Sequence, residues 1–109
     1  MSSSYDFFEF VQDQLSHLGE IDKKRMFGVL GLYMNGLMFG VISEDVVYLK
    51  VDDSNRQKFL DAGSTTLKVF KNNSEVPSYY ELPVDVLERA EEFIEWAKES
   101  YEIQVRNSK

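Results

Sequence analysis

The stretch from Arg25 to Asn55, RMFGVLGLYMNGLMFGVISEDVVYLKVDDSN, decides the fold class. Its apolar residues recur at every second position, a period that is typical of β-strands. Asn35-Gly36 lies between two such runs, and an Asn-Gly pair favours the tight two-residue turn of a β-hairpin. We therefore predict a hairpin centred on this turn and a third strand from Val46 to Val51.

The turn also predicts which side chains share a face of the hairpin. Residues that lie opposite each other across two antiparallel strands point to the same side. Closing the chain at the turn gives one apolar face made of three opposed pairs: Met34 with Leu37, Leu32 with Phe39, and Leu30 with Val41. A three-residue loop, 43–45, adds Val47, Leu49 and Val51 to that face, whereas a two-residue loop breaks the agreement.

The opposite face of these strands is less polar than a sheet face in water should be. An antiparallel sheet with one solvated face normally alternates apolar and polar residues. This second face instead carries five apolar or aromatic residues: Tyr33, Met38, Ile42, Val46 and Tyr48. Either the chain's own helices and remaining strands cover it, or it is a self-association surface, because exposed apolar patches usually mark a partner.

The rest of the chain predicts three helices and two more strands. Periodicity and end signals place helices at Tyr5–Leu18, Asn55–Ala62 and about Pro83–Ile103, and strands at Leu67–Phe70 and Ser78–Leu82. Residues 20–24 are predicted to be a polar link, and Gly19 and Gly63 to end the first two helices in a left-handed conformation.

The fold class is therefore α+β, with the element order α-β-β-β-α-β-β-α. Helices are expected to cover one face of a mainly antiparallel, five-stranded sheet. Residues 1–109 form a single domain, and residues 1–4 and about 104–109 are predicted to be disordered tails.

Composition narrows the class of protein. The formal net charge is −7, which gives no electrostatic attraction to phosphate, so direct nucleic-acid binding is not expected. The chain has no cysteine, which fits a cytoplasmic protein. No apolar run has the length of a membrane span, and the first residues lack a secretory signal, so no membrane contact is expected either.

The sequence shows no pattern that is typical of a catalytic or cofactor site. The glycines are spread along the hairpin and do not open a helix, as a phosphate-binding loop requires. His17, the sole histidine, lies off the apolar arc of the first helix and has no histidine or cysteine partners for a metal. We expect no enzymatic activity, no catalytic residue, no cofactor and no metal.

Two further features leave alternatives open. Lys23-Lys24-Arg25 is the only basic cluster, and it is either solvated or a contact for an acidic partner. Trp96 lies at the margin of the apolar stripe of the last helix, with Ile103 on the same ridge. It is either a tryptophan at the edge of the core or an interface anchor, since tryptophan is favoured at interaction hot spots.

These observations define a candidate interaction surface. It combines the second sheet face, the end of the basic cluster and the Trp96 ridge: Arg25, Tyr33, Met38, Ile42, Tyr48, Tyr79, Trp96 and Ile103. A different hypothesis is a small-molecule-binding or enzymatic module, whose pocket lies near Arg25, Tyr33 and Tyr79.

A family resemblance is carried by several motifs in a fixed order. They are the quoted stretch, then Phe59 and Gly63, then SYYELP at 78–83, then Trp96-Ala97. Together they resemble the TfoX N-terminal domain, which is the first domain of the TfoX/Sxy regulators of natural competence. The resemblance covers roughly residues 7–99.

The resemblance implies an α+β domain of the secretion-chaperone-like class that is commonly a homodimer. It also implies a role in transcriptional control of DNA uptake, together with the cyclic-AMP receptor protein. Full-length regulators of the family carry a second domain after this one, and the sequence stops at Lys109 without it. A stand-alone relative and a fragment both stay open, so fold transfers better than function.

Our first hypothesis follows from the residues and the resemblance together. It is a non-enzymatic regulatory domain that forms a homodimer through the apolar sheet surface or the Trp96 ridge. This domain is expected to contact the transcription machinery through a protein partner.

Overall fold

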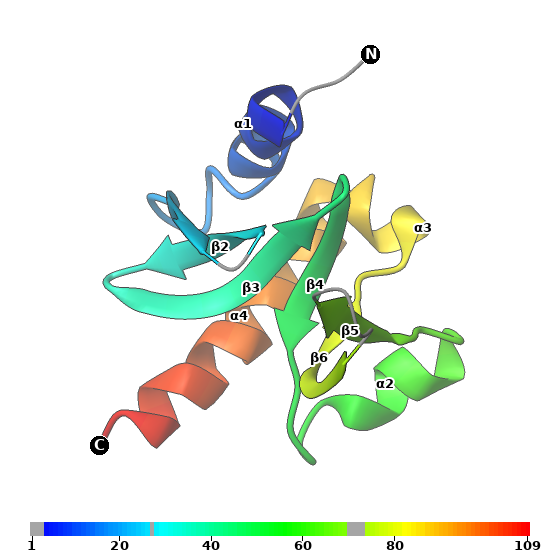
Figure 1. Cartoon of the computed structure of the whole chain (residues 1–109). Coiled ribbons are helices and arrows are strands. Elements are labelled where there is room, and N and C mark those ends of the chain that lie inside the picture. The colour runs from blue at the N-terminus through cyan, green and yellow to red at the C-terminus, as the bar shows by residue number, and fades with distance from the viewer. Residues whose placement is uncertain (1–3, 27, 70–73) are drawn as a thin grey trace.

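The computed structural model describes residues 4–26, 28–69 and 74–109. Its elements, in chain order, are α1 (Ser4–Gln14), β1 (Asp22–Met26), β2 (Val29–Met34), β3 (Leu37–Ser43), β4 (Val46–Lys50), α2 (Arg56–Asp61), β5 (Thr66–Val69), β6 (Ser74–Glu81), α3 (Val84–Leu87) and α4 (Ala90–Asn107). The strands form one six-stranded antiparallel sheet in the order β1-β2-β3-β4-β6-β5 (Figure 1). The predicted α+β class and antiparallel sheet are confirmed.

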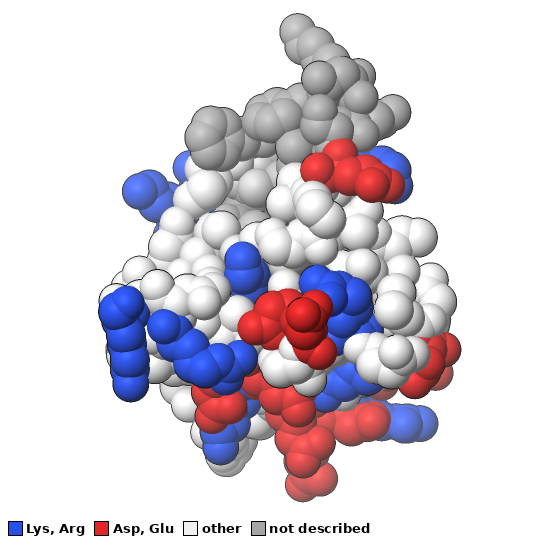
Figure 2. All heavy atoms as spheres, turned by 90° about the horizontal axis from the view of Figure 1, so that it is seen from below, with Lys and Arg blue, Asp and Glu red and all other residues white. Residues whose placement is uncertain are grey.

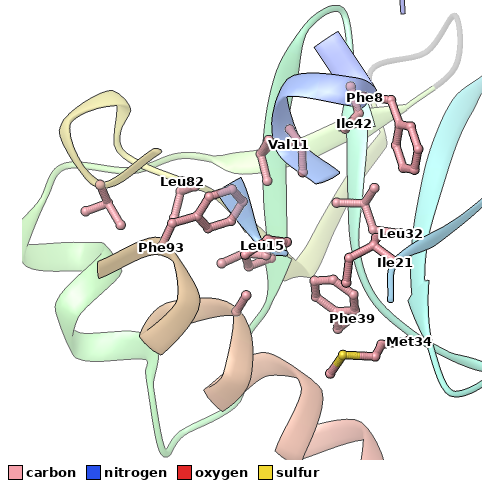
Figure 3. Packing of buried hydrophobic residues seen from close by; sticks show 14 of the residues in the cluster. Phe8, Val11, Leu15, Ile21, Leu32, Met34, Phe39, Ile42, Leu82 and Phe93 are labelled. Carbon is pink, nitrogen blue, oxygen red and sulfur yellow. The ribbon is translucent and has the colours of Figure 1, made fainter. Parts of the chain in front are cut away.

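The long helix α4 crosses one side of the sheet and builds the main core there. It packs on β3 and β4, and α1 and α3 pack beside it (Figure 1). Phe8 and Val11 of α1, and Leu15 directly after it, are buried in this helix-side core, as the predicted apolar arc requires (Figure 3). In the same core Phe39 of β3 lies beside Met34 and Ile21 (Figure 3).

The sheet has six strands where the sequence predicted five, because the polar link is itself partly a strand. β1 consists of DKKRM and its first four residues are exposed. An edge strand needs only backbone pairing on one side, so an almost wholly charged segment can form it. Apolar periodicity, the signal used for the other strands, is absent from such a segment.

The hairpin register differs from the prediction at one residue. Asn35 and Gly36 have φ of 53° and 81°, and Met34 lies opposite Leu37, as the predicted tight turn requires. Tyr33 then pairs with Met38, but Leu32 pairs with Gly40, so Phe39 is an extra residue in β3. This is a β-bulge, in which two residues of one strand oppose one residue of the other.

The bulge changes which side chains of β3 face the helices. Leu30 lies opposite Ile42, so Ile42 enters the helix-side core and is 2% exposed. Val41 lies opposite Gly31 and belongs to the other face. The predicted pairings of Leu32 with Phe39 and of Leu30 with Val41 were therefore wrong, and so was the placement of Ile42 on the second face.

The next turn was also predicted wrongly, and it compensates for the first error. Ser43 pairs with Val46, and Glu44 and Asp45 have φ of 52° and 61°, so the loop has two residues and not three. The bulge has already shifted β3 by one residue. This shorter turn therefore keeps Val47 and Leu49 of β4, and Val51 directly after it, in the helix-side core, where they were predicted.

The second half of the chain follows the predicted order with longer elements. β6 begins at Ser74, although Pro77 argued for a start at Ser78. Residues 77–79 lie between Val76 and Tyr80, whose partners Leu67 and Thr66 are adjacent on β5. Pro77 therefore sits in an irregular part of the ladder, where a missing N–H costs no regular hydrogen bond.

The helix ends show three further differences. Gly63 has the predicted positive φ of 76°, whereas Gly19 does not have one. The last predicted helix is two helices, α3 and α4, which a break at 88–89 separates. α4 continues to Asn107, so the disordered tail predicted from about 104 is wrong. Gln104 Nε2 donates a 2.7 Å hydrogen bond to the carbonyl oxygen of Met38, which holds this end of the helix on the sheet. The predicted tail at 1–4 lies mainly outside the described residues.

Gly40 permits the bulge by leaving room for the neighbouring strand. A Cβ at this position would lie 2.8 Å from the carbonyl oxygen of Tyr48 and 3.1 Å from Cδ2 of Leu49. We predict that Gly40→Ala lowers the free energy of unfolding by about 1–3 kcal/mol in urea titrations, because backbone must move to relieve the contact.

A matched control is Gly19→Ala. Its Cβ would meet only the sulfur end of Met34, at 2.8 Å, and that flexible side chain can turn aside. The expected loss is below about 1 kcal/mol. Equal losses at the two positions would contradict the account of Gly40.

Candidate interaction surface

The second face of the sheet carries its own apolar cluster, with side chains from all six strands. Four are buried, namely Val29, Val41, Leu67 and Tyr79, and four are half-buried, namely Met26, Met38, Tyr48 and Val76. We call these eight residues the second-face cluster. No described helix contributes a residue to it, so among the described residues this cluster is built by strands alone. The self-association alternative stays a prediction.

Two side chains of this face close over Gly31. A Cβ at Gly31 would lie 3.0 Å from both Cε1 of Tyr33 and Sδ of Met38. Each neighbour would have to move to accommodate it. The absence of a side chain at this position therefore lets Tyr33 and Met38 lie flat on the sheet, where both remain half-buried.

Tyr79 of β6 and Lys50 of β4 lie opposite each other on the second face. The Lys50 ammonium lies 5.4 Å from the centroid of the Tyr79 ring, within the range of a cation–π contact. Burial, with Tyr33 as a second cause, raises the pKa of Tyr79 to about 12. Burial and the carboxylates of Glu81 and Glu44 also raise the pKa of Tyr48.

The phenols of Tyr79 and Tyr48 are uncharged at neutral pH, and their raised pKa values extend this uncharged range to higher pH. Both hydroxyls stay protonated, so the face presents neutral, hydrogen-bonding aromatic side chains. Such side chains suit a protein contact, because an aromatic ring supplies apolar area and its hydroxyl can pair with a polar group of the partner.

The structure brings together only part of the predicted candidate surface. Tyr33, Met38, Tyr48 and Tyr79 share the second face. Arg25 lies opposite Leu30, which belongs to the helix-side core, so Arg25 is on the other face of the sheet.

Two predicted residues do not lie on any surface. Ile42 is 2% exposed and Ile103 is 1% exposed, and both are buried within this chain. A pocket was predicted near Arg25, Tyr33 and Tyr79. The two tyrosines lie on the same face of the sheet, and Arg25 lies on the opposite face. A ligand-sized cavity between them stays a prediction.

Trp96 is a half-buried residue of α4 that packs against α2. Its ring meets the Phe59 ring edge to face, with centroids 4.8 Å apart and an interplanar angle of 71°. The Lys58 ammonium lies 4.5 Å from the Trp96 centroid and 2.6 Å from a carboxylate oxygen of Glu99. Trp96 therefore packs against the edge of the core, which agrees with the first of its two interpretations.

Sequence reasoning missed two buried polar residues that hold the end of β4. Ser100 Oγ donates to the Lys50 carbonyl oxygen at 2.7 Å, and Asn55 Nδ2 donates to the same oxygen at 3.1 Å. Ser100 follows Phe93 and Ala97 on the buried side of α4, and that helical spacing could have identified it. These bonds fix the backbone that carries Lys50.

The family comparison decides what kind of domain this is. The family model described as the TfoX N-terminal domain matches residues 13–103. The chain belongs to the TfoX N-terminal domain family. No curated protein matches the sequence significantly.

Charges of both signs mix on the lower surface of this TfoX N-terminal domain. Over α2 and α4, Lys and Arg alternate with Asp and Glu (Figure 2). Ion pairs join Arg56 to Asp53, Lys58 to Glu99 and Arg106 to Asp52. This face presents no broad basic stripe of the kind that tracks a phosphate backbone.

Within 4–26, 28–69 and 74–109, no helix combines the length and apolar composition that crossing a membrane requires. The same ranges hold no group of three or more His, Asp or Glu side chains that could bind a metal ion.

Burial of Tyr79 makes the stability of the domain depend on alkaline pH. Its folded pKa of about 12 lies above the ordinary value of 10.0, so the folded state keeps a proton that the unfolded chain has lost. The stabilisation is complete below pH 10 and is lost as pH rises through 12, by roughly 2–3 kcal/mol in total.

Tyr79→Phe has no hydroxyl to titrate, so we predict a smaller loss of unfolding free energy across that range than in the unmodified protein. Urea titrations at several alkaline pH values measure the difference. Identical pH profiles for the two proteins would show that the Tyr79 hydroxyl is not buried.

Proposed function

We propose that this TfoX N-terminal domain is a non-enzymatic regulatory domain that forms a homodimer through its second sheet face. The observation that carries the proposal is the second-face cluster, an apolar surface without a described covering helix. Three half-buried side chains at its border, Tyr33, Met38 and Tyr48, offer ring and thioether area to a partner. Apolar patches with aromatic side chains are typical of interaction sites.

The sheet face suits self-association better than the Trp96 ridge does. The Trp96 ring already packs against Phe59 and the Lys58 ammonium, and Ile103 lies on the buried side of α4. A two-fold contact uses the same patch on both copies, and the aromatic and thioether groups of this patch can pack against their own counterparts without charge repulsion.

Family membership supports a role in transcription. Since related TfoX/Sxy regulators control genes of DNA uptake, we propose that this domain acts there too, by contacting the cyclic-AMP receptor protein. The net charge of −7 and the mixed lower surface favour a protein contact over direct binding of DNA.

The dimer is tested by sedimentation equilibrium at micromolar concentration. We predict that the unmodified chain is dimeric and that Met38→Glu weakens the dimer at least about tenfold, because a carboxylate without a partner would be buried in the interface. Val84→Glu is the matched control, since Val84 is 58% exposed on α3, and it should leave the dimer unchanged.

Two results would overturn this part of the proposal. One is a strict monomer at every concentration of the unmodified chain. The other is a dimer that Met38→Glu leaves intact and that Trp96→Ala disrupts while the circular dichroism spectrum stays native, which would move the interface to the ridge.

The transcription role is tested with purified components. Biolayer interferometry would measure binding of the chain to the cyclic-AMP receptor protein, alone and on a duplex that carries its site. We predict binding to the receptor protein and none to the bare duplex. Binding to the bare duplex that falls steeply with salt would replace the protein contact with direct DNA binding, and binding to neither would remove the role.

A further inference from the structure

The outer edge of β1 is an open sheet edge with an unusual charge. β1 is the first strand in the sheet order, so its partner β2 covers only one side. Among the described residues, the backbone hydrogen bonds outside helices and strands include none from 22–26. An edge strand of this kind can accept one more strand from another chain.

Three consecutive cations occupy the middle of this edge. Lys23, Lys24 and Arg25 are all exposed, in a chain whose net charge is −7. None of the ion pairs within the described part of the chain involves Lys24 or Arg25. At the opposite edge of the sheet, Lys68 of β5 forms an ion pair within the chain, because its Nζ lies 3.8 Å from Oε2 of Glu75 on β6.

The cations point to both sides of the sheet. Lys23 and Arg25 lie opposite Leu32 and Leu30, so they share the helix side, and Lys24 lies opposite Gly31 on the second face. The Lys23 ammonium is held 4.7 Å from the centroid of the Phe8 ring. A strand added along β1 would therefore meet positive charge on each of its two faces.

This charge argues against a second copy as the occupant. Antiparallel pairing of two β1 strands over their full length places Lys24 opposite its own counterpart and Lys23 opposite Arg25. Like charges that lie directly opposite in a sheet are destabilising. The same charges attract a segment that carries acidic side chains at consecutive positions.

We propose that the β1 edge binds an extended, acidic segment of a protein partner, which adds to the sheet as a seventh strand. Backbone hydrogen bonds to the open edge supply affinity, and carboxylates opposite Lys23, Lys24 and Arg25 supply specificity. This inference deepens the proposed function by naming the chemistry of the protein partner, and it rests on the chain being an interaction domain. It uses the outer edge of β1, which borders the face of the proposed dimer.

The test measures binding of a fluorescein-labelled peptide by anisotropy at low salt. The probe is a short peptide with three central glutamates between valines and threonines, and lysines replace the glutamates in the control peptide. We predict binding of the acidic peptide only, with faster hydrogen exchange at Asp22–Met26 in the free protein than in the complex.

Two changes separate strand addition from simple charge attraction. An acidic peptide with N-methyl groups on alternate backbone amides should bind at least about tenfold more weakly, because it cannot pair with the edge. Lys24→Glu/Arg25→Glu should cause at least a similar loss by charge reversal. Lys98→Glu/Lys109→Glu, which reverses two exposed charges elsewhere, is the matched control and should bind normally.

Several outcomes would overturn the proposal. They are no binding of the acidic peptide, equal binding of the N-methylated peptide, or normal binding by Lys24→Glu/Arg25→Glu. Binding of duplex DNA that the same variant abolishes would make the edge a nucleic-acid contact instead. If the double reversal does not fold, Lys24→Gln/Arg25→Gln gives the same comparison with neutral side chains.

Peptide binding by Met38→Glu separates this inference from the proposed dimer. The variant should bind the acidic peptide normally while its dimer is weakened. Loss of peptide binding in Met38→Glu would place the peptide on the second face and overturn the assignment to β1.

Discussion

One extra residue in β3 determines which side chains face the helices and which face the other side of the sheet. Phe39 and Gly40 together oppose Leu32, and the strand continues with its alternation reversed. The close approach of β4 to Gly40 leaves no room for a second side chain beside Phe39. If Phe39 instead paired with Leu32 in an unbroken ladder, Val41 would enter the helix-side core and Ile42 would face the other side.

The two faces that result have different properties. Helices cover the helix side, and hydrogen bonds join α4 to the carbonyl oxygens of Lys50 and Met38 and to Asn35 in the hairpin turn. The second face is built by strands alone among the described residues, and its border side chains are half-buried. The open β1 edge borders both faces. In the proposed function, the helix side stabilises the domain, and the second face and the β1 edge bind partners.

The sequence predicted much of this architecture because strong local signals carry it. The Asn35-Gly36 turn, the apolar arc of α1 and the stripe of α4 each determine a local structure within a few residues. The bulge could not be predicted, since Phe39 and Gly40 form it through contacts with Leu32 and β4, which are distant in the chain. β1 was missed because backbone pairing alone makes it a strand.

Part of the candidate surface could also be predicted from local sequence signals. Tyr33 and Met38 lie opposite each other between the turn and the bulge, so their face follows from the Asn35-Gly36 turn. Tyr48 was placed on the correct face because the two-residue loop after β3 offsets the bulge. Ile42 lies just past the bulge and was placed on the wrong face. Ser100 was overlooked because its role depends on the Lys50 carbonyl oxygen, a group that no side-chain pattern reveals.

The register of β2 and β3 is the claim on which both faces depend, and nuclear Overhauser effects between backbone protons measure it directly. The account predicts cross-strand effects that link Leu32 with Gly40 and Leu30 with Ile42. Effects that link Leu32 with Phe39 and Leu30 with Val41 would contradict it, since they would show an unbroken ladder and exchange the residues of the two faces.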